Sequence, residues 1–167
     1  MTHDGPMVRK SIELLDVQEV RRAATEVVSA FETDWRSDLG AAEIHHIGAT
    51  ALSFGHTKGD VDVNVRVREA EFRAVVHALS TRLAVAQAEN WTPTFASFSD
   101  DRYRLPLGVQ VTVIGSPDDF LLHLRDELNA NPEFLRRYDD VKVTTAANGA
   151  EAYWQAKNRF LEALKPR

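Results

Sequence analysis

The segment Ile44–Val67 reads IHHIGATALSFGHTKGDVDVNVRV and carries the strongest structural signal in the chain. In its last eight residues, from Asp60 to Val67, valines alternate strictly with polar side chains. This period of two indicates a half-buried strand with one apolar face. Asp60 and Asp62 are therefore expected on the same face, with their Cα atoms roughly 6.5 Å apart. Carboxylates that converge in this way suit Mg²⁺, which binds one or two of them together with substrate phosphates.

A solvated strand face is the alternative interpretation, because charged side chains there also discourage edge-to-edge pairing of sheets. The upstream segment Ile47–Thr50 favours the metal site, since Gly48 and its small neighbours let a phosphate approach the backbone N–H groups. A small-residue turn, a connector of about ten residues and then Asp-hydrophobic-Asp on a strand is the arrangement of the nucleotidyltransferase superfamily. The pattern therefore predicts a site for a nucleotide and a metal.

The same segment resembles the GrpB family, whose usual form reads H-I-G-S-T-A-V-P-G-L-x-x-K-P-I-I-D-I. The positions that match in register are His46, Ile47, Gly48, Thr50, Ala51, Lys58 and Asp62. Leu124–Leu128 is similar to the family's F-R-D-Y-L. The later matches are Pro132, Tyr138, Lys142, Tyr153, Lys157 and Phe160. The resemblance implies a nucleotidyltransferase-like fold in which Tyr138 and Lys142 face the cleft.

Three departures from the family pattern bear on activity. Ala49 stands where the family has serine, Gly59 replaces a proline, and Asp60 replaces an aliphatic residue. A third carboxylate is expected from the later strand 107–113, but its outward positions offer Gln110 and Thr112 rather than an acid. A two-metal displacement would therefore lack a ligand.

Composition limits the class of protein. The 167 residues fit one domain, and 44% hydrophobic with 27% charged residues is ordinary for a soluble globular protein. The net charge of −5 argues against broad nucleic-acid binding. There are no cysteines, and neither an apolar span nor a secretory signal is recognisable. We expect a cytoplasmic protein without membrane segments; its oligomeric state is not predicted.

The hydrophobic period changes along the chain from two to about 3.6 residues and back. The expected strands cover residues 10–15, 42–47, 60–67, 94–98 and 109–114. The expected helices cover residues 17–38, 69–83, 116–129, 131–146 and 150–164. Capping residues mark several of the helix starts, with Asp16 before the first and Ser116-Pro117 opening the third.

We therefore predict an α+β fold, a nucleotidyltransferase-like mixed sheet flanked by helices, with a helical C-terminal layer. Residues 1–167 are expected to form a single domain. Its α/β core covers about 10–115, and its C-terminal helices cover about 116–165.

Several other side chains have more modest interpretations. His45 and His46 are consecutive on a strand and point to opposite faces, so a zinc cluster with His56 is disfavoured. His46 is expected to support the Gly48 turn by hydrogen bonding, and Arg125 with Asp126 to form a bracing pair. Trp91 and Trp154 are assigned to packing.

Two functions remain. The first is Mg²⁺-dependent transfer of a nucleotidyl group from a nucleoside triphosphate to an unknown acceptor. The predicted metal-binding and catalytic residues are Asp60 and Asp62, and the predicted nucleotide-binding residues are Gly48, Ala49, Thr50, Lys58 and Lys142. The second function is a catalytically inactive nucleotide- or ligand-binding module on the same fold, and the missing third acid is the reason to consider it.

Overall fold

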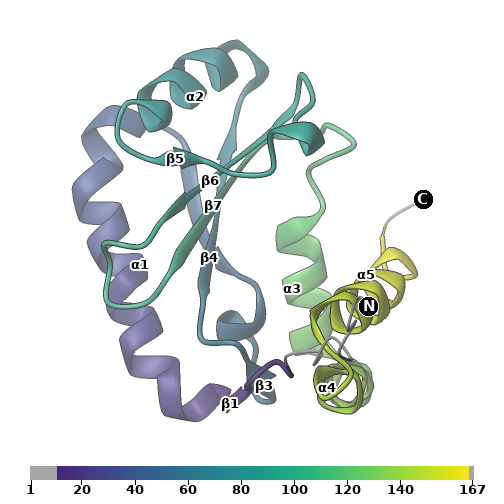
Figure 1. Cartoon of the computed structure of the whole chain (residues 1–167). Helices are drawn as coiled ribbons and strands as arrows, with labels where there is room; N and C mark the ends of the chain where they lie inside the picture. The colour runs from purple at the N-terminus through teal and green to yellow at the C-terminus, as the bar shows by residue number, and fades with distance from the viewer. Residues whose placement is uncertain (1–10, 166–167) are drawn as a thin grey trace, which may run out of the picture.

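A computed structural model describes residues 11–165, which form a mixed sheet with helices on both faces (Figure 1). The strands are β1 (Leu15–Asp16), β2 (Glu43–Ile47), β3 (His56–Thr57), β4 (Val61–Val67), β5 (Ala84–Val85), β6 (Phe95–Asp100) and β7 (Leu107–Val113). The helices are α1 (Val17–Leu39), α2 (Phe72–Ser80), α3 (Leu121–Ala130), α4 (Pro132–Ala146) and α5 (Ala150–Glu162). Short 3₁₀ turns occur at η1 (Ala49–Ala51), η2 (Glu69–Glu71) and η3 (Ala88–Asn90).

The five main strands lie in the order β2-β4-β7-β6-β5. β4 and β7 are parallel, and every other neighbouring pair in this sheet is antiparallel. β1 and β3 pair separately. Helices α1 and α2 lie on one side of the sheet, and α3, α4 and α5 lie on the other (Figure 1). The predicted α+β class, with a mixed sheet flanked by helices, is confirmed.

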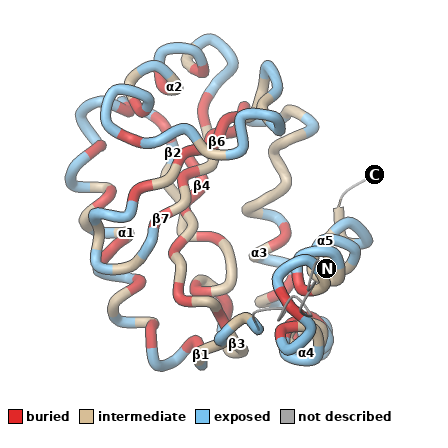
Figure 2. The backbone as a smooth tube through the Cα atoms, in the orientation of Figure 1, coloured by how far each residue is buried: buried red, intermediate tan, exposed pale blue. Residues whose placement is uncertain are grey.

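The alternation along β4 separates two faces of the sheet. Its four valines are buried and belong to one hydrophobic core with α1 and α2, as the buried stretches in Figure 2 indicate. Burying each such side chain stabilises the fold by about 1.5–3 kcal/mol. The opposite face carries Asp62, Asn64 and Arg66 and is directed toward the C-terminal helices. Register places Gly108 beside Asp62 on the neighbouring strand β7.

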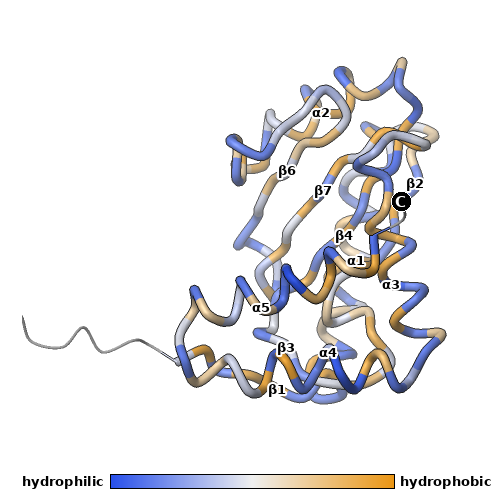
Figure 3. Tube along the Cα trace, turned by 90° about the vertical axis from the view of Figure 1, so that its right-hand side faces the viewer, coloured by the Kyte–Doolittle hydropathy of each residue, from blue (hydrophilic) through white to orange (hydrophobic). Residues whose placement is uncertain are grey.

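A second, smaller core attaches the C-terminal layer to the turn after β2. Leu52 follows η1 and packs with Leu128 of α3 and with Leu135 and Tyr138 of α4. Hydrophobic and hydrophilic stretches alternate along α4 and α5, as expected of amphipathic helices that cover a core on one side (Figure 3). Among residues 11–165, no helix combines the length and the apolar composition that crossing a bilayer requires.

Two helices begin where their capping residues predict. The Asp16 carboxylate accepts a hydrogen bond from the Gln18 N–H at 2.8 Å at the start of α1. The Asn131 side chain accepts from the Phe134 N–H at 3.2 Å at the start of α4, where Pro132 is the first helical residue.

The predicted start of the third helix at Ser116 is wrong, because α3 begins only at Leu121. The two aspartates that follow Ser116 and Pro117 have other partners. Asp119 binds the Arg66 guanidinium through both carboxylate oxygens, at 2.7 and 2.8 Å. Asp118 accepts hydrogen bonds from the hydroxyls of Thr92 and Thr94. Tertiary contacts therefore hold residues 116–119 in a turn.

The bounds of other elements differ from the predicted ones by a few residues. The expected strand at 10–15 shortens to β1, and residue 10 lies outside the described part of the chain. The expected helix 69–83 becomes η2 followed by the shorter α2. Aspartate 60 precedes β4 instead of opening it.

Candidate functional site

The turn between β2 and η1 forms one wall of the site. Gly48 adopts a φ of 74°, in the left-handed region that favours glycine, and η1 follows at once. A hydrogen bond of 2.8 Å between His46 Nε2 and Thr50 Oγ1 spans the turn, which confirms the structural role predicted for His46. Burial, together with the nearby charges of Arg125 and Arg21, lowers the pKa of His46 to about 4. His46 is therefore neutral at physiological pH.

The Asp62 carboxylate lies between two glycines. A Cβ atom added to Gly48 would lie 2.5 Å from Asp62 Oδ2, and one added to Gly108 would lie 2.6 Å from Oδ1. Any larger residue at either position would collide with the carboxylate unless it moved. Burial, and to a lesser degree the charge of Asp60, raises the pKa of Asp62 from 3.8 to about 6. The sequence therefore holds a carboxylate in a confined position where its ionised form is costly.

Asp60 lies just before β4, where its surroundings are more open. Its Oδ2 atom is 3.8 Å from Lys58 Nζ. The Lys58 ammonium also lies 4.2 Å from the ring centre of Trp154, and the Lys157 ammonium lies 4.7 Å from the same ring. Trp154, which was assigned to packing, is 40% exposed. Its ring instead brings two cations close to the two aspartates.

A cavity of about 140 Å³ opens beside Asp62, between the sheet and the C-terminal helices. Besides Arg125, four polar side chains line it: Asp62 from β4, Gln110 from β7, Tyr138 from α4 and Lys157 from α5. Within residues 11–165, no hydrogen bond or ion pair is made by any of these four side chains. Polar groups in such a partly buried position normally have partners. Their convergence on one cavity is therefore the strongest indication of a ligand site in the molecule.

Leucine side chains form the rest of the cavity wall. The aliphatic lining residues are Ile47, Leu52, Leu121, Leu124, Leu128 and Leu161. Arg125 also borders the cavity, but its guanidinium donates to the His46 carbonyl and to Asp126. The predicted bracing pair of Arg125 and Asp126 is thereby confirmed.

Comparison with known proteins identifies the family. The family model described as GrpB protein matches residues 16–167. The chain belongs to the GrpB family. It is 25% identical over 154 residues to a UPF0157 protein of Vibrio cholerae serotype O1, a match that covers 92% of this chain and 82% of that protein. The crystal structure of the conserved protein GrpB from Enterococcus faecalis superposes with a TM-score of 0.68 at 16% identity, over 91% of this chain and 99% of that one. The structural match shows the shared fold.

In this GrpB-family protein, the cavity brings together some of the predicted site residues. Gly48 and Asp62 line it directly. The predicted residues that do not line it are Ala49, Thr50, Lys58, Asp60 and Lys142. Thr50 is 1% exposed and its hydroxyl is engaged by His46, whereas Lys58 and Asp60 remain partly accessible next to Trp154.

Lys142 is placed differently from the cleft position that the family resemblance implied. Its side chain is buried, and its ammonium donates a hydrogen bond to the His56 carbonyl oxygen and lies 3.9 Å from Asp139 Oδ1. Burial lowers the pKa of Lys142 to about 8. Lys142 therefore attaches β3 to α4.

Lys157 is the cation that sequence reasoning missed as a site residue. It stands in the closing Y…K…F match to the GrpB family, so the signal was present, but only the fold places α5 beside Asp62. Burial lowers the pKa of Lys157, and the charge of Asp62 opposes that effect. Tyr138, which the family resemblance implied to face the cleft, does belong to the cavity wall.

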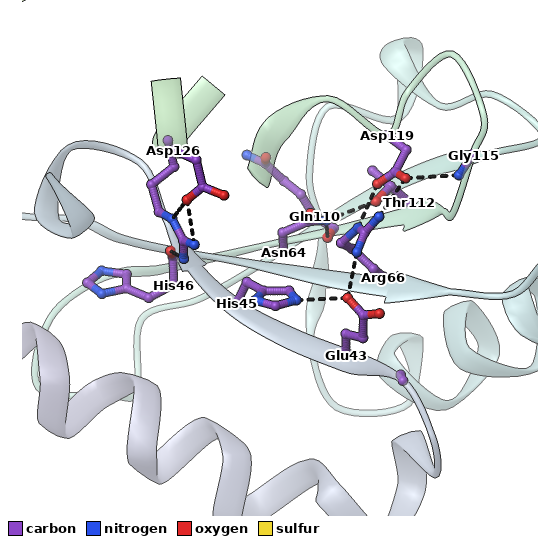
Figure 4. A network of polar contacts seen from close by, with 12 residues as sticks. Glu43, His45, His46, Asn64, Arg66, Gln110, Thr112, Gly115, Asp119 and Asp126 are labelled. Atoms are coloured by element: carbon purple, nitrogen blue, oxygen red, sulfur yellow. Dashed lines mark hydrogen bonds and ion pairs between the residues drawn. The ribbon is translucent and has the colours of Figure 1, made fainter. Parts of the chain in front are cut away.

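The far end of the same sheet face is occupied by a closed polar network (Figure 4). Arg66 binds Asp119 on one side and the Glu43 carboxylate at 2.6 Å on the other. Glu43 also bonds to His45 at 2.8 Å, and Asp119 accepts from the Gly115 N–H. These groups provide one another with hydrogen-bond and ion-pair partners. The network at this end of the sheet therefore stabilises the fold.

The candidate metal ligands at this site are carboxylates, because the nearby histidines are engaged elsewhere. The three histidines considered in the sequence have separate partners: His45 bonds to Glu43, His46 to Thr50 and His56 to Asp139. Within residues 11–165, no group of three or more histidine, aspartate or glutamate side chains is close enough to hold a metal ion. A divalent ion would therefore depend on Asp60 and Asp62 and on oxygen atoms brought by a ligand.

Proposed function

We propose that this protein binds a Mg²⁺–nucleoside triphosphate complex at Asp60 and Asp62 and transfers the nucleotidyl group to an acceptor. The observation that carries the proposal is the Asp62 carboxylate, which is confined by Gly48 and Gly108 and has no protein partner among the described residues. A confined, unpaired carboxylate beside a cavity is suited to a cation.

The donor set fits magnesium. Two carboxylates provide hard oxygen ligands, and phosphate oxygens of the nucleotide complete the shell that Mg²⁺ prefers. Asp60 and Asp62 would hold the ion, and the ion when bound supplies positive charge to the phosphates. A bound cation also favours the ionised form of Asp62, whose pKa is otherwise raised to about 6.

Lysine side chains of the protein would neutralise the phosphate charge that the metal ion does not. Lys157 lines the cavity without a carboxylate partner within residues 11–165, and Lys58 lies beside Asp60. The backbone from Gly48 to Thr50 is expected to face the phosphates. A cavity of about 140 Å³ is too small for a nucleotide, so the nucleotide would bind next to it, over the exposed Trp154 side.

In the transfer step, an acceptor atom bonds to the α-phosphorus while the bond from that phosphorus to the bridging oxygen breaks. Pyrophosphate departs with the electron pair, and the acceptor's proton passes to solvent. The protein contributes by positioning and by electrostatic stabilisation.

Isothermal titration with ATP, with and without Mg²⁺, tests the binding half of the proposal. We expect saturable binding that requires Mg²⁺ and is lost in Asp62→Ala. Asp140→Ala is the matched control, because Asp140 is an exposed aspartate on α4. Undiminished binding by Asp62→Ala would exclude this site.

Gln110 favours a second candidate, a binding module without turnover. It is the residue of β7 that lines the cavity, and an amide cannot act as the third carboxylate. Labelled ATP incubated with Mg²⁺ and candidate acceptors separates the two functions. Pyrophosphate release supports transfer, whereas binding without release supports the module.

A further inference from the structure

The leucine wall of the cavity is not explained by a magnesium–triphosphate complex. Leu121, Leu124 and Leu128 stand on one face of α3 and point into the cavity together with the other aliphatic lining residues. Phosphates and metal ions gain nothing from aliphatic contacts, whereas an apolar group of a ligand is stabilised by leaving water. The wall therefore fits a second, apolar ligand group.

The size of the cavity limits that group. Its volume is about 140 Å³, and an aliphatic-lined protein cavity of about 150 Å³ binds benzene. A six-carbon ring, or a chain of similar volume, therefore fits.

A nucleobase suits this wall poorly. The polar edge of a base requires hydrogen-bond partners, and burying it against leucines would leave those atoms unsatisfied. The polar groups available in the cavity are Gln110 from β7, Tyr138 from α4 and Lys157 from α5, whereas three of the leucines come from α3. The occupant is expected to have an apolar body and a single polar head.

A hydroxyl group matches those polar side chains. The Gln110 amide can both donate and accept a hydrogen bond, and the Lys157 ammonium donates. Asp62 and Lys157 carry opposite charges, so a ligand with a neutral polar group leaves the net charge of the cavity unchanged. We infer that the cavity binds a small alcohol, with an apolar body of about six or seven carbon atoms against α3 and its hydroxyl on Gln110 and Lys157.

This binding needs no nucleotide. The alcohol's role as acceptor does rest on the proposed function: its oxygen would bond to the α-phosphorus, pyrophosphate would leave with the electron pair, and the hydroxyl proton would pass to solvent. Binding and transfer can therefore fail separately.

Titration of the full chain with benzyl alcohol, followed by NMR in the absence of nucleotide, tests the inference. We expect saturable binding with a dissociation constant of about a millimolar, as suits a ligand of so few atoms. Toluene should bind about fivefold more weakly because it lacks the hydroxyl. Glycerol, which lacks the apolar body, should show no saturable binding.

Two variants of α3 locate the site. Leu121→Trp fills the cavity and should weaken binding about tenfold, whereas Leu122→Trp, at an adjacent half-buried position that does not line the cavity, should leave it unchanged. Intermolecular NOEs from the benzyl ring to the leucine methyls of α3 in the unmodified protein provide a readout if Leu121→Trp does not fold.

The inference is overturned if benzyl alcohol does not saturate, if glycerol or toluene binds as well, or if the NOEs fall elsewhere. Unchanged binding by folded Leu121→Trp would also overturn it. Loss of Mg²⁺–ATP binding in a protein that still binds the alcohol would refute the proposed function and support the cavity as an independent site.

Discussion

Gly48 lies so close to the Asp62 carboxylate that a side chain at position 48 would collide with it. A methyl group at Gly48 would lie 2.5 Å from Asp62 Oδ2, and Gly108 approaches the other carboxylate oxygen almost as closely. Each glycine therefore lies against a different oxygen of the Asp62 carboxylate. Both glycines are needed for the position of this carboxylate.

Gly48→Ala should therefore displace the Asp62 carboxylate and abolish Mg²⁺-dependent ATP binding. Its free energy of unfolding should fall by about 1–3 kcal/mol, from the collision together with the strain of a positive φ. Gly40→Ala is the matched control, since Gly40 also has a positive φ but has open space at its Cβ position. Urea unfolding and calorimetric titration of both variants measure the difference. Equal effects of the two substitutions would show that backbone strain, and not contact with Asp62, is responsible.

Asp62 should also make stability depend on pH. Its pKa rises from 3.8 to about 6 on folding because the carboxylate is buried. The folded state thus binds the proton more tightly, and stability present below pH 3.8 is lost as pH rises through about 6. Asp62→Asn removes this loss, so at pH 7 it should be more stable than the unmodified protein by up to about 3 kcal/mol.

Urea unfolding between pH 3.5 and 7.5 with EDTA measures this effect, and Asp140→Asn is the exposed control. The stabilities of Asp62→Asn and the unmodified protein should converge near pH 3.5. Parallel pH profiles would mean that Asp62 is not held as described.

Strand β4 and two helix starts could be predicted from sequence, because each depends on residues that are close together in the chain. Alternating valines located β4, and Asp16 and Asn131 located helix starts through their own hydrogen bonds. Ser116 failed as a helix start because Arg66, distant in sequence, binds Asp119. A capping pattern cannot show such a competing partner.

The candidate site was predicted only in part for the same reason. Gly48 and Asp62 lie within fifteen residues of each other, and their spacing was informative. Lys157 reaches Asp62 only because α5 folds back over the sheet, and nothing in its neighbours distinguishes it from Lys142. Trp154 was assigned to packing without a function, but its ring is 40% exposed and contacts two lysines beside the site.

The Arg66–Asp119 pair should contribute to stability above acidic pH. The Arg66 guanidinium lowers the pKa of Asp119 below its ordinary value of 3.8. The stabilisation is therefore present above pH 3.8 and is lost as pH falls below it. Asp119→Asn should reduce the free energy of unfolding at pH 7 by about 1.5–3 kcal/mol, the usual effect of hydrogen bonds to a charged group.

Denaturant unfolding at pH 7 checks this value, and Mg²⁺-dependent ATP binding by the folded variant should be unchanged, because Asp119 does not line the cavity. A loss of ATP binding would mean that the polar network belongs to the site.

Lys157 and Lys142 should have opposite effects when each is replaced by methionine. Lys157 lines the cavity without a carboxylate partner among residues 11–165, and burial lowers its pKa. Lys157→Met should leave the free energy of unfolding unchanged or slightly higher, and should weaken Mg²⁺-dependent ATP binding at least about tenfold, as expected for a lost contact to phosphate.

Lys142→Met removes the donor to the buried His56 carbonyl and should cost about 1–3 kcal/mol of stability. Its ATP affinity, measured under conditions where the variant is folded, should change less than about twofold, since its ammonium does not reach the cavity. The reverse result, with binding lost in folded Lys142→Met and kept in Lys157→Met, would assign the phosphate contact to Lys142, as the sequence predicted. Both titrations should be run at pH 7, where Lys142, with a pKa of about 8, is still mostly protonated.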